Sequence, residues 1–186
     1  LLAVTSYFTF VGTRQGDLIL ASNALLMQFF LLFSYFMDGF AYAGEALCGK
    51  AFGANNRDAF RSITRRLFVW GGSMALMTAM VYYGLGTPIL ELLTDTPEVV
   101  RCATDFLPLV ALIPLVSFPA FLFDGIFIGM SFTSGMLRAL IVATVIFFAL
   151  HLLTSHLWGN TALWVAFLAY LGTRGIVQAI ALRRKF

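Results

Sequence analysis

Residues 106–130 read FLPLVALIPLVSFPAFLFDGIFIGM, a run whose only charged side chain is that of Asp124. About 20 consecutive apolar residues are enough for a helix to cross the hydrocarbon core of a bilayer. An ionised carboxylate inside that core is costly, so an acid in such a segment usually belongs to a functional site. The run therefore predicts a transmembrane helix that carries a functional acid in its second half.

The rest of the chain has the same apolar character. Of its 186 residues 60% are hydrophobic and only 11% are charged, and the mean hydropathy is +0.89. A soluble domain carries about 25% charged residues, so this composition indicates an integral membrane protein. Lipid offers no partner for a free backbone amide, and runs of this length satisfy their amides as helices. The predicted fold is an all-α, polytopic transmembrane helix bundle, formed by residues 1–186 as a single lobe.

Five full spans are predicted, at residues 18–48, 67–86, 106–130, 137–157 and 162–182. The apolar stretch 1–11 is too short to cross a bilayer and has no initiator methionine, so we expect the chain to begin inside a sixth span. It also lacks the basic region and cleavage site of a signal peptide.

The distribution of charge predicts the orientation, because cytoplasmic loops collect lysine and arginine. With alternating spans, every Lys and Arg except Arg14 and Arg101 falls on one side, including Arg174 near the inner end of the last span. We therefore expect a cytoplasmic C-terminus in the inner (plasma) membrane of the cell. This asymmetry explains the pI of about 9.1 without a nucleic-acid partner. The opposite surface should carry an acidic rim of Asp17, Glu91, Asp95, Glu98 and Asp105.

The span 18–48 carries a polar stripe, which we define as Gln28, Tyr35, Asp38, Tyr42 and Glu45. Their spacing places all five side chains on one face of a helix, and lipid would penalise that face. We expect the stripe to face the bundle interior or a wet cavity, where its residues bind a coupling ion or a substrate. The alternative, hydrogen bonding to neighbouring helices alone, stays open. For Glu45, near the inner surface, pairing with headgroups or a loop arginine is favoured.

The span 106–130 contains three prolines, Pro108, Pro114 and Pro119, each of which removes a backbone donor from a helix. We predict a kinked or broken helix there, with the prolines as gating or hinge positions beside Asp124. Packing kinks beside an acid that satisfies a helix terminus are the alternative.

Glycine and phenylalanine patterns add three expectations. Each of Asp38 and Asp124 is followed at once by a glycine and by another glycine eleven positions on, which predicts a similar depth for the two carboxylates. Gly125 and Gly129, like Gly39 and Ala43, are four apart and would let helices approach closely. Phenylalanines flank Asp124 and could form an aromatic site for a flat organic cation, with core packing as the alternative.

Three stretches resemble the multidrug and toxic compound extrusion (MATE) transporters, in particular their DNA-damage-inducible F (DinF) branch. Residues 36–55, FMDGFAYAGEALCGKAFGAN, are similar to the eighth helix and following loop of that family. Residues 123–129, FDGIFIG, are similar to its tenth helix, and residues 93–99, LTDTPEV, to the loop before that helix. Glu45, Gly49 and Gly53 belong to the first of these stretches and would form a cytoplasmic motif.

The resemblance implies the C-terminal six-helix lobe of a twelve-helix antiporter, with its first helix truncated. It further implies two lobes around a central cleft, so the N-terminal lobe of the same protein would be a partner. Organic cations or amphipathic compounds would leave the cell in exchange for protons or sodium, without a further cofactor. Asp124 matches the acid of the tenth helix that helps to bind Na⁺ in sodium-coupled relatives, and the coupling ion stays open.

Other functions receive less support from the residues. A lipid-linked saccharide flippase would need a large cationic cavity, whereas the predicted spans hold at most Arg174 as an internal cation. A membrane-embedded enzyme would need Asp38 and Asp124 to share a proton. A scaffold would leave the acids and prolines unexplained. Because the chain has no nucleophile elbow, no paired metal-binding histidines and no phosphate-binding glycine loop, we expect neither an enzyme nor a structural metal site.

Overall fold

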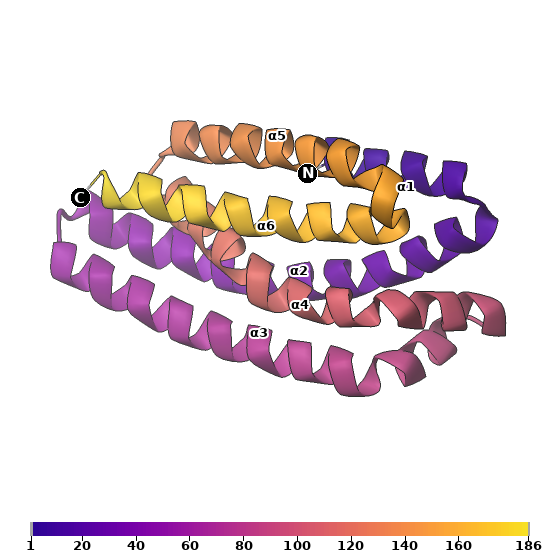
Figure 1. The fold of residues 1–186 in the computed structure, drawn as a ribbon. Helices are drawn as coiled ribbons and strands as arrows, with labels where there is room; N and C mark the ends of the chain where they lie inside the picture. Colours follow the sequence, from indigo (N-terminus) through magenta and orange to yellow (C-terminus); the bar gives the residue numbers. More distant parts are fainter. Residues whose placement is uncertain (1, 186) are drawn as a thin grey trace.

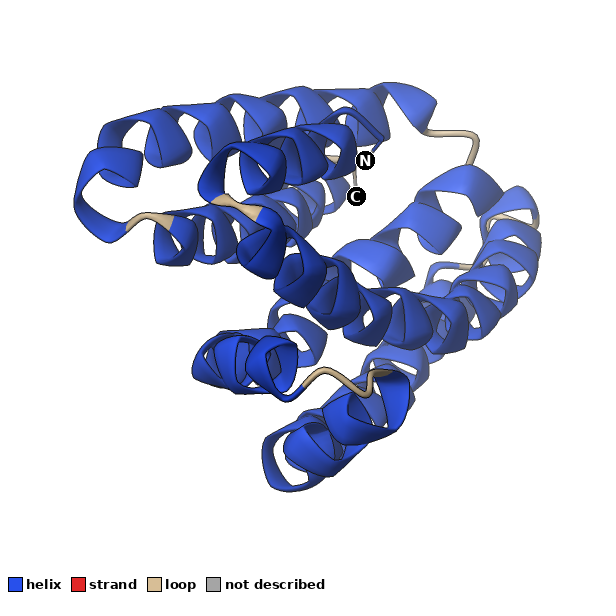
Figure 2. Ribbon diagram, turned by 90° about the vertical axis from the view of Figure 1, so that its right-hand side faces the viewer, coloured by secondary structure: helices blue, strands red, loops and turns tan. Residues whose placement is uncertain are grey.

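The computed structural model describes residues 2–185, which form a bundle of helices lying side by side (Figures 1 and 2). The helices are α1 (Leu2–Gln15), α2 (Asp17–Gly53), α3 (Arg57–Leu93), α4 (Pro97–Gly129), α5 (Thr133–Trp158) and α6 (Asn160–Arg183). The predicted all-α fold is confirmed. Leu1, where the first predicted segment begins, lies outside the described residues.

The helices α2 to α6 are each long and apolar enough to cross a membrane. Each predicted span falls within one of them, apart from Met130, which follows the last residue of α4. The helices are longer than the spans: α2 and α3 have 37 residues each, or about 55 Å at the helical rise. The predicted spans contain only the apolar residues that fit the thickness of the hydrocarbon core. The helices are longer because their backbone hydrogen bonds continue into the polar residues on either side.

Short connections join consecutive helices. Gly16 separates α1 from α2 with a φ of 105°, a left-handed conformation that glycine adopts without a steric penalty. The side chain of Asn56 caps α3 by accepting a 2.9 Å hydrogen bond from the Ala59 amide. Pro97 begins α4, where its missing N–H costs nothing. These short turns make neighbouring helices antiparallel, so α2, α4 and α6 run in the same direction.

Helix α4 forms the centre of the lobe, because it packs against α2, α3 and α6, while α5 packs on α6 (Figure 1). Its closest neighbour is α2. A Cβ atom at Gly125 would overlap the backbone carbonyl of Ala41, and one at Gly129 would overlap that of Glu45. The predicted close approach at Gly125 and Gly129 is therefore confirmed. Among the described residues nothing lies within 4 Å of a Cβ at Gly39, so no close approach is found there within this lobe.

Of the kink or break predicted for the proline-rich segment, the break is wrong, and the kink stays a prediction. Helix α4 continues through Pro108, Pro114 and Pro119 as one helix. In a membrane bundle, neighbouring helices and small backbone adjustments compensate for the lost amides. Here α4 has helices on several sides, and Pro114 is buried. Aromatic side chains fill the rest of the core, the largest fully buried ones being Trp164, Tyr170, Phe30, Phe33, Phe127, Phe147 and Phe167.

Candidate ion-coupling site

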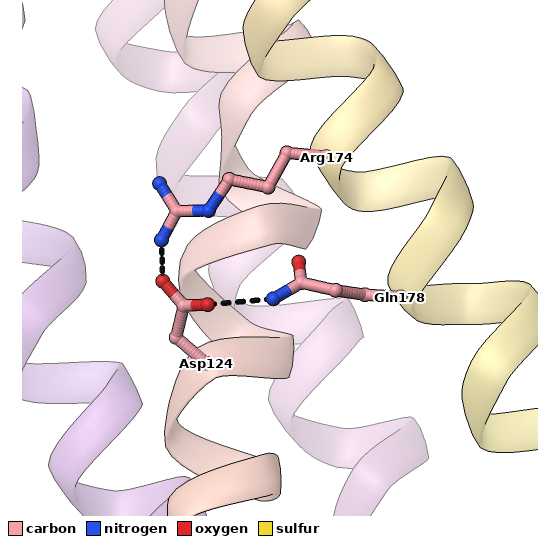
Figure 3. A network of polar contacts seen from close by, with 3 residues as sticks. All are labelled: Asp124, Arg174 and Gln178. Carbon is pink, nitrogen blue, oxygen red and sulfur yellow. Dashed lines mark hydrogen bonds and ion pairs between the residues drawn. The ribbon is translucent and has the colours of Figure 1, made fainter. Parts of the chain in front are cut away.

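Asp124 of α4 points towards α6, where two side chains bind its carboxylate (Figure 3). Arg174 Nη2 forms an ion pair with Oδ2, and Gln178 Nε2 donates a 2.6 Å hydrogen bond to Oδ1. The side chains of Asp124 and Arg174 are only 17% and 14% exposed, and Gln178 is buried. Both carboxylate oxygens therefore have a donor in a largely buried site.

The local sequence of α6 explains this geometry. Arg174 and Gln178 are four residues apart, so they lie on the same face of the helix. Gly175 packs tightly beside them, since a Cβ there would lie 3.3 Å from Pro119 and 3.4 Å from the Ala120 amide nitrogen. This contact brings α6 close to α4 one turn before Asp124.

The position of Arg174 corrects the sequence interpretation, which grouped it with the cytoplasmic cations. It lies inside α6, nine positions before the last helical residue, Arg183. Gln178 was missed as a site residue. The available signal was the charge of Arg174, because an arginine within an apolar span needs an acidic partner, and Asp124 lies within another predicted span.

Asp38 and Asp124 lie at a similar height in the bundle but on different faces. Ala41 lies opposite Gly125 and Glu45 opposite Gly129, so the offset between α2 and α4 is the same at both contacts. That register places Asp38 within two residues of the level of Asp124, or about 3 Å along the axis. Among residues 2–185, no hydrogen bond or ion pair joins the two carboxylates.

The polar stripe of α2 lies on the outer surface of the lobe formed by residues 2–185. Of the two settings expected for it, the interior of this lobe is excluded, and a wet cavity stays a prediction. Tyr35 and Tyr42 are 69% and 70% exposed, Gln28 is exposed, and Asp38 and Glu45 are half-buried. The opposite face of α2 supplies the core through large apolar side chains, including Leu26, Phe30, Phe33 and Met37. Burial of that face turns the stripe away from this lobe. Gln28 and Tyr35 line a shallow groove of about 270 Å³.

The phenylalanines around Asp124 do not enclose its carboxylate. Phe118 and Phe123 pack against Phe68 of α3, and Phe121 packs against Phe33 of α2. Helical geometry separates consecutive side chains by about 100°, so neighbours in sequence face different helices. The aromatic cation site proposed from these residues is therefore not formed.

The motif of Glu45, Gly49 and Gly53, which the resemblance predicts to be cytoplasmic, has a packing role at two of its three positions. The backbone of Glu45 contacts Gly129, and a Cβ at Gly49 would lie 2.8 Å from the Gly129 carbonyl oxygen. Gly53, the last residue of α2, has open space around it.

Unsatisfied polar atoms extend from the ion pair along the same helical faces. Ser117 Oγ, Tyr170 Oη and Gln178 Oε1 are buried without a hydrogen-bond partner in the described part of the chain. Ser117 precedes Asp124 by seven residues and Tyr170 precedes Arg174 by four, so they share the faces of the two charged residues. Buried polar groups without protein partners usually bind water or an ion.

Comparison with known proteins identifies the family. The MatE family profile matches residues 3–171. Over 176 residues the chain is 37% identical to DNA damage-inducible protein F of Escherichia coli (strain K12). This alignment covers 95% of the present chain and 38% of the E. coli protein. It is 25% identical to Protein DETOXIFICATION 45, chloroplastic, of Arabidopsis thaliana over 173 residues, or 93% of this chain and 31% of the relative.

These matches agree with the five membrane-length helices of the structure. The chain spans 38% and 31% of the lengths of these two relatives. No solved structure matches. The profile covers most of the chain, and the resemblance drawn from residues 36–55, 93–99 and 123–129 is confirmed. The chain belongs to the MatE family, whose members are multi-pass membrane transporters and not enzymes.

Proposed function

We propose that this chain is the C-terminal lobe of a secondary antiporter that exports organic cations or amphipathic compounds in exchange for protons or sodium. The proposal rests on one observation: Arg174 and Gln178 of α6 bind the carboxylate of Asp124 of α4, and both helices are long and apolar enough to cross a membrane. Residues in this setting typically belong to ion pathways. We place the protein in the plasma membrane with its C-terminus in the cytoplasm, following the positive-inside distribution.

The coupling ion must compete with Arg174 for the carboxylate. A proton or sodium ion on Asp124 removes the negative charge that stabilises the guanidinium. A charge that loses its partner in a dry site is strongly destabilised, so Arg174 then moves towards water or another acid. Because Arg174 and Asp124 lie on different helices, this movement repacks α6 against α4. Ion binding thereby favours one of two arrangements of the lobe.

Gln178 can stabilise both states of Asp124. Its amide group contains a donor and an acceptor. In the present state Nε2 donates to the ionised carboxylate, and the buried Oε1 is without a partner among the described residues. After protonation, the same oxygen can accept a hydrogen bond from the Asp124 hydroxyl. With sodium instead, Gln178 Oε1 and the carboxylate would both serve as oxygen ligands.

The polar stripe of α2 forms one wall of the substrate path in this proposal. The rings of Tyr35 and Tyr42 are exposed, and in the proposed arrangement they would face a second, N-terminal lobe across a cleft. Such faces suit flat or cationic organic compounds. Asp38 adds a negative charge near the level of Asp124, and Gln28 adds a hydrogen-bonding group on the same stripe.

The prolines of α4 serve as the hinge. Pro108, Pro114 and Pro119 each leave a carbonyl without its helical donor, which lowers the cost of bending the helix there. Pro119 also contacts Gly175 of α6, next to Arg174. A flippase for lipid-linked saccharides is disfavoured, because the guanidinium of Arg174 is occupied by Asp124.

The test is Asp124→Asn in the full-length protein, reconstituted into liposomes with an imposed proton or sodium gradient. We expect gradient-driven export of a dye cation to fall to background in Asp124→Asn and also in Asp124→Asn/Arg174→Gln. The double variant leaves no unpaired charge, so it should remain monodisperse and folded. Asp95→Asn, at an exposed acid of the loop before α4, should export normally. Normal export by Asp124→Asn would remove Asp124 from the coupling mechanism.

A further inference from the structure

A groove runs along one face of the lobe between α3 and α6. Its apolar part encloses about 560 Å³. The lining residues of this part include Val116, Pro119 and Phe123 of α4, Phe68 of α3, and Ile176 and Ala179 of α6. A second hollow of about 470 Å³ continues the groove towards the end of α6. The two hollows are continuous, because Thr64, Phe68, Leu182 and Arg183 line both of them.

Three arginines surround the second hollow. Arg61 and Arg65 are one turn apart on α3, and Arg183 faces them from the end of α6. All three are exposed, and among residues 2–185 none of them has an ion-pair partner. Asp58, the acid in the first turn of α3, pairs with neither Arg61 nor Arg65. The groove is therefore apolar along its length and positively charged at one end.

The groove is separate from the ion pair and from the polar stripe. Ile176 lines the groove two positions after Arg174, which places their side chains about 200° apart around α6. No residue of α2 lines either hollow. The groove therefore belongs to a different face of the lobe from the ion pair and the polar stripe.

We propose that this groove binds an anionic phospholipid of the membrane. Arg61, Arg65 and Arg183 bind the headgroup phosphate, and an acyl chain lies along Phe68, Ile176 and the α4 floor. The guanidinium fork matches the geometry of phosphate oxygens, and basic pockets between membrane helices are suited to anionic headgroups. A zwitterionic lipid would instead bring its own cation towards three unpaired arginines.

The bound lipid would also connect two helices that are otherwise linked indirectly. Both α3 and α6 pack on α4 and share few direct contacts with each other. The phosphate would bridge Arg61 and Arg65 to Arg183 across that gap. Because α6 also carries Arg174, the lipid would stabilise the helix that holds the ion pair.

The experiment measures lipid binding to the purified full-length protein by native mass spectrometry. Phosphatidylglycerol and phosphatidylcholine with identical acyl chains are compared, with glycerol 3-phosphate as a headgroup without chains. We expect phosphatidylglycerol to bind at least about tenfold more tightly than phosphatidylcholine, given the contribution of each basic residue near an anionic lipid. The variant R61Q/R65Q/R183Q should lose this preference.

Two controls keep the result specific. R66Q/R138Q/R184Q removes the same charge from exposed arginines that line neither hollow, and should keep the preference. Ala179→Phe fills the apolar part and should weaken binding of both lipids. Equal binding of the two lipids to the unmodified protein would overturn the proposal. Equal losses in the two triple variants, or glycerol 3-phosphate binding as tightly as phosphatidylglycerol, would overturn it too.

Discussion

The guanidinium of Arg174 on α6 and the carboxylate of Asp124 on α4 form an ion pair across the two helices, fifty residues apart in sequence. Their charges cancel in a site where either one alone would be poorly solvated. Removal of either partner would leave the other charge uncompensated, which is strongly destabilising. In the proposed mechanism, a competing cation acts at this pair.

Arg174→Gln should destabilise the protein, because it leaves the Asp124 carboxylate with only Gln178 as a donor. Removing one partner of a buried pair costs about 3 kcal/mol. Thermal unfolding of the purified full-length protein in detergent measures the effect. The double variant Arg174→Gln/Asp124→Asn should regain part of the loss, since no charge is then left unpaired. If the loss of stability in the double variant equals the sum of the losses in the two single variants, the two residues do not interact.

Gln178→Leu should lower stability by about 1–3 kcal/mol, because it removes the 2.6 Å hydrogen bond to Asp124 Oδ1 in a buried position. Gln28→Leu makes the same chemical change on the exposed stripe of α2 and should be nearly neutral. Denaturation midpoints of the two variants provide the comparison. Equal midpoints would mean that the Gln178 hydrogen bond contributes nothing to folding.

Gly125→Ala should disrupt the contact between α4 and α2, because the added Cβ overlaps the carbonyl of Ala41. Overpacking of a tight contact costs about 1–3 kcal/mol. Gly39→Ala is the matched control, since nothing lies within 4 Å of its Cβ position. Yields of monodisperse protein and melting temperatures should fall for Gly125→Ala alone, and a similar fall for Gly39→Ala would argue against the close approach.

Asn160→Ala should loosen the end of the bundle at which α6 begins. Asn23 and Asn160 exchange hydrogen bonds of 2.8 and 2.9 Å, and Trp164 Nε1 donates to Asn23 Oδ1 at 3.0 Å. The substitution removes Asn160 Oδ1, which accepts the hydrogen bond from the buried Asn23 Nδ2. An unsatisfied buried donor costs about 1–3 kcal/mol of folding free energy. Hydrogen exchange should rise first in the adjoining turns of α2 and α6. Unchanged exchange there would contradict a clamping role.

Cysteine labelling tests the orientation. Ala54→Cys and Asp95→Cys are introduced singly after Cys48 and Cys102 are replaced by alanine; both positions are exposed, at opposite ends of α3. A membrane-impermeant thiol reagent added to intact cells should label Asp95→Cys and leave Ala54→Cys unlabelled until the cells are opened. The reverse pattern would invert the proposed topology.

Several features could be predicted from sequence because they depend on local chemistry. An apolar run such as 106–130 must satisfy its own amides in lipid, so it predicts a helix without reference to its neighbours. The stretch 36–55 was enough to indicate the family. The tight contact at Gly125 was also predictable, because a missing side chain allows close approach whatever the partner helix is.

The sequence alone determined the helices, the membrane environment and the family, since each follows from residues close together in the chain. Tertiary structure decided that Arg174 lies within the bundle opposite Asp124, that α4 continues through its prolines, and that the α2 stripe faces outward. These features depend on which face of each helix meets which neighbour. That choice comes from the packing of all the helices together, so no single segment contains it.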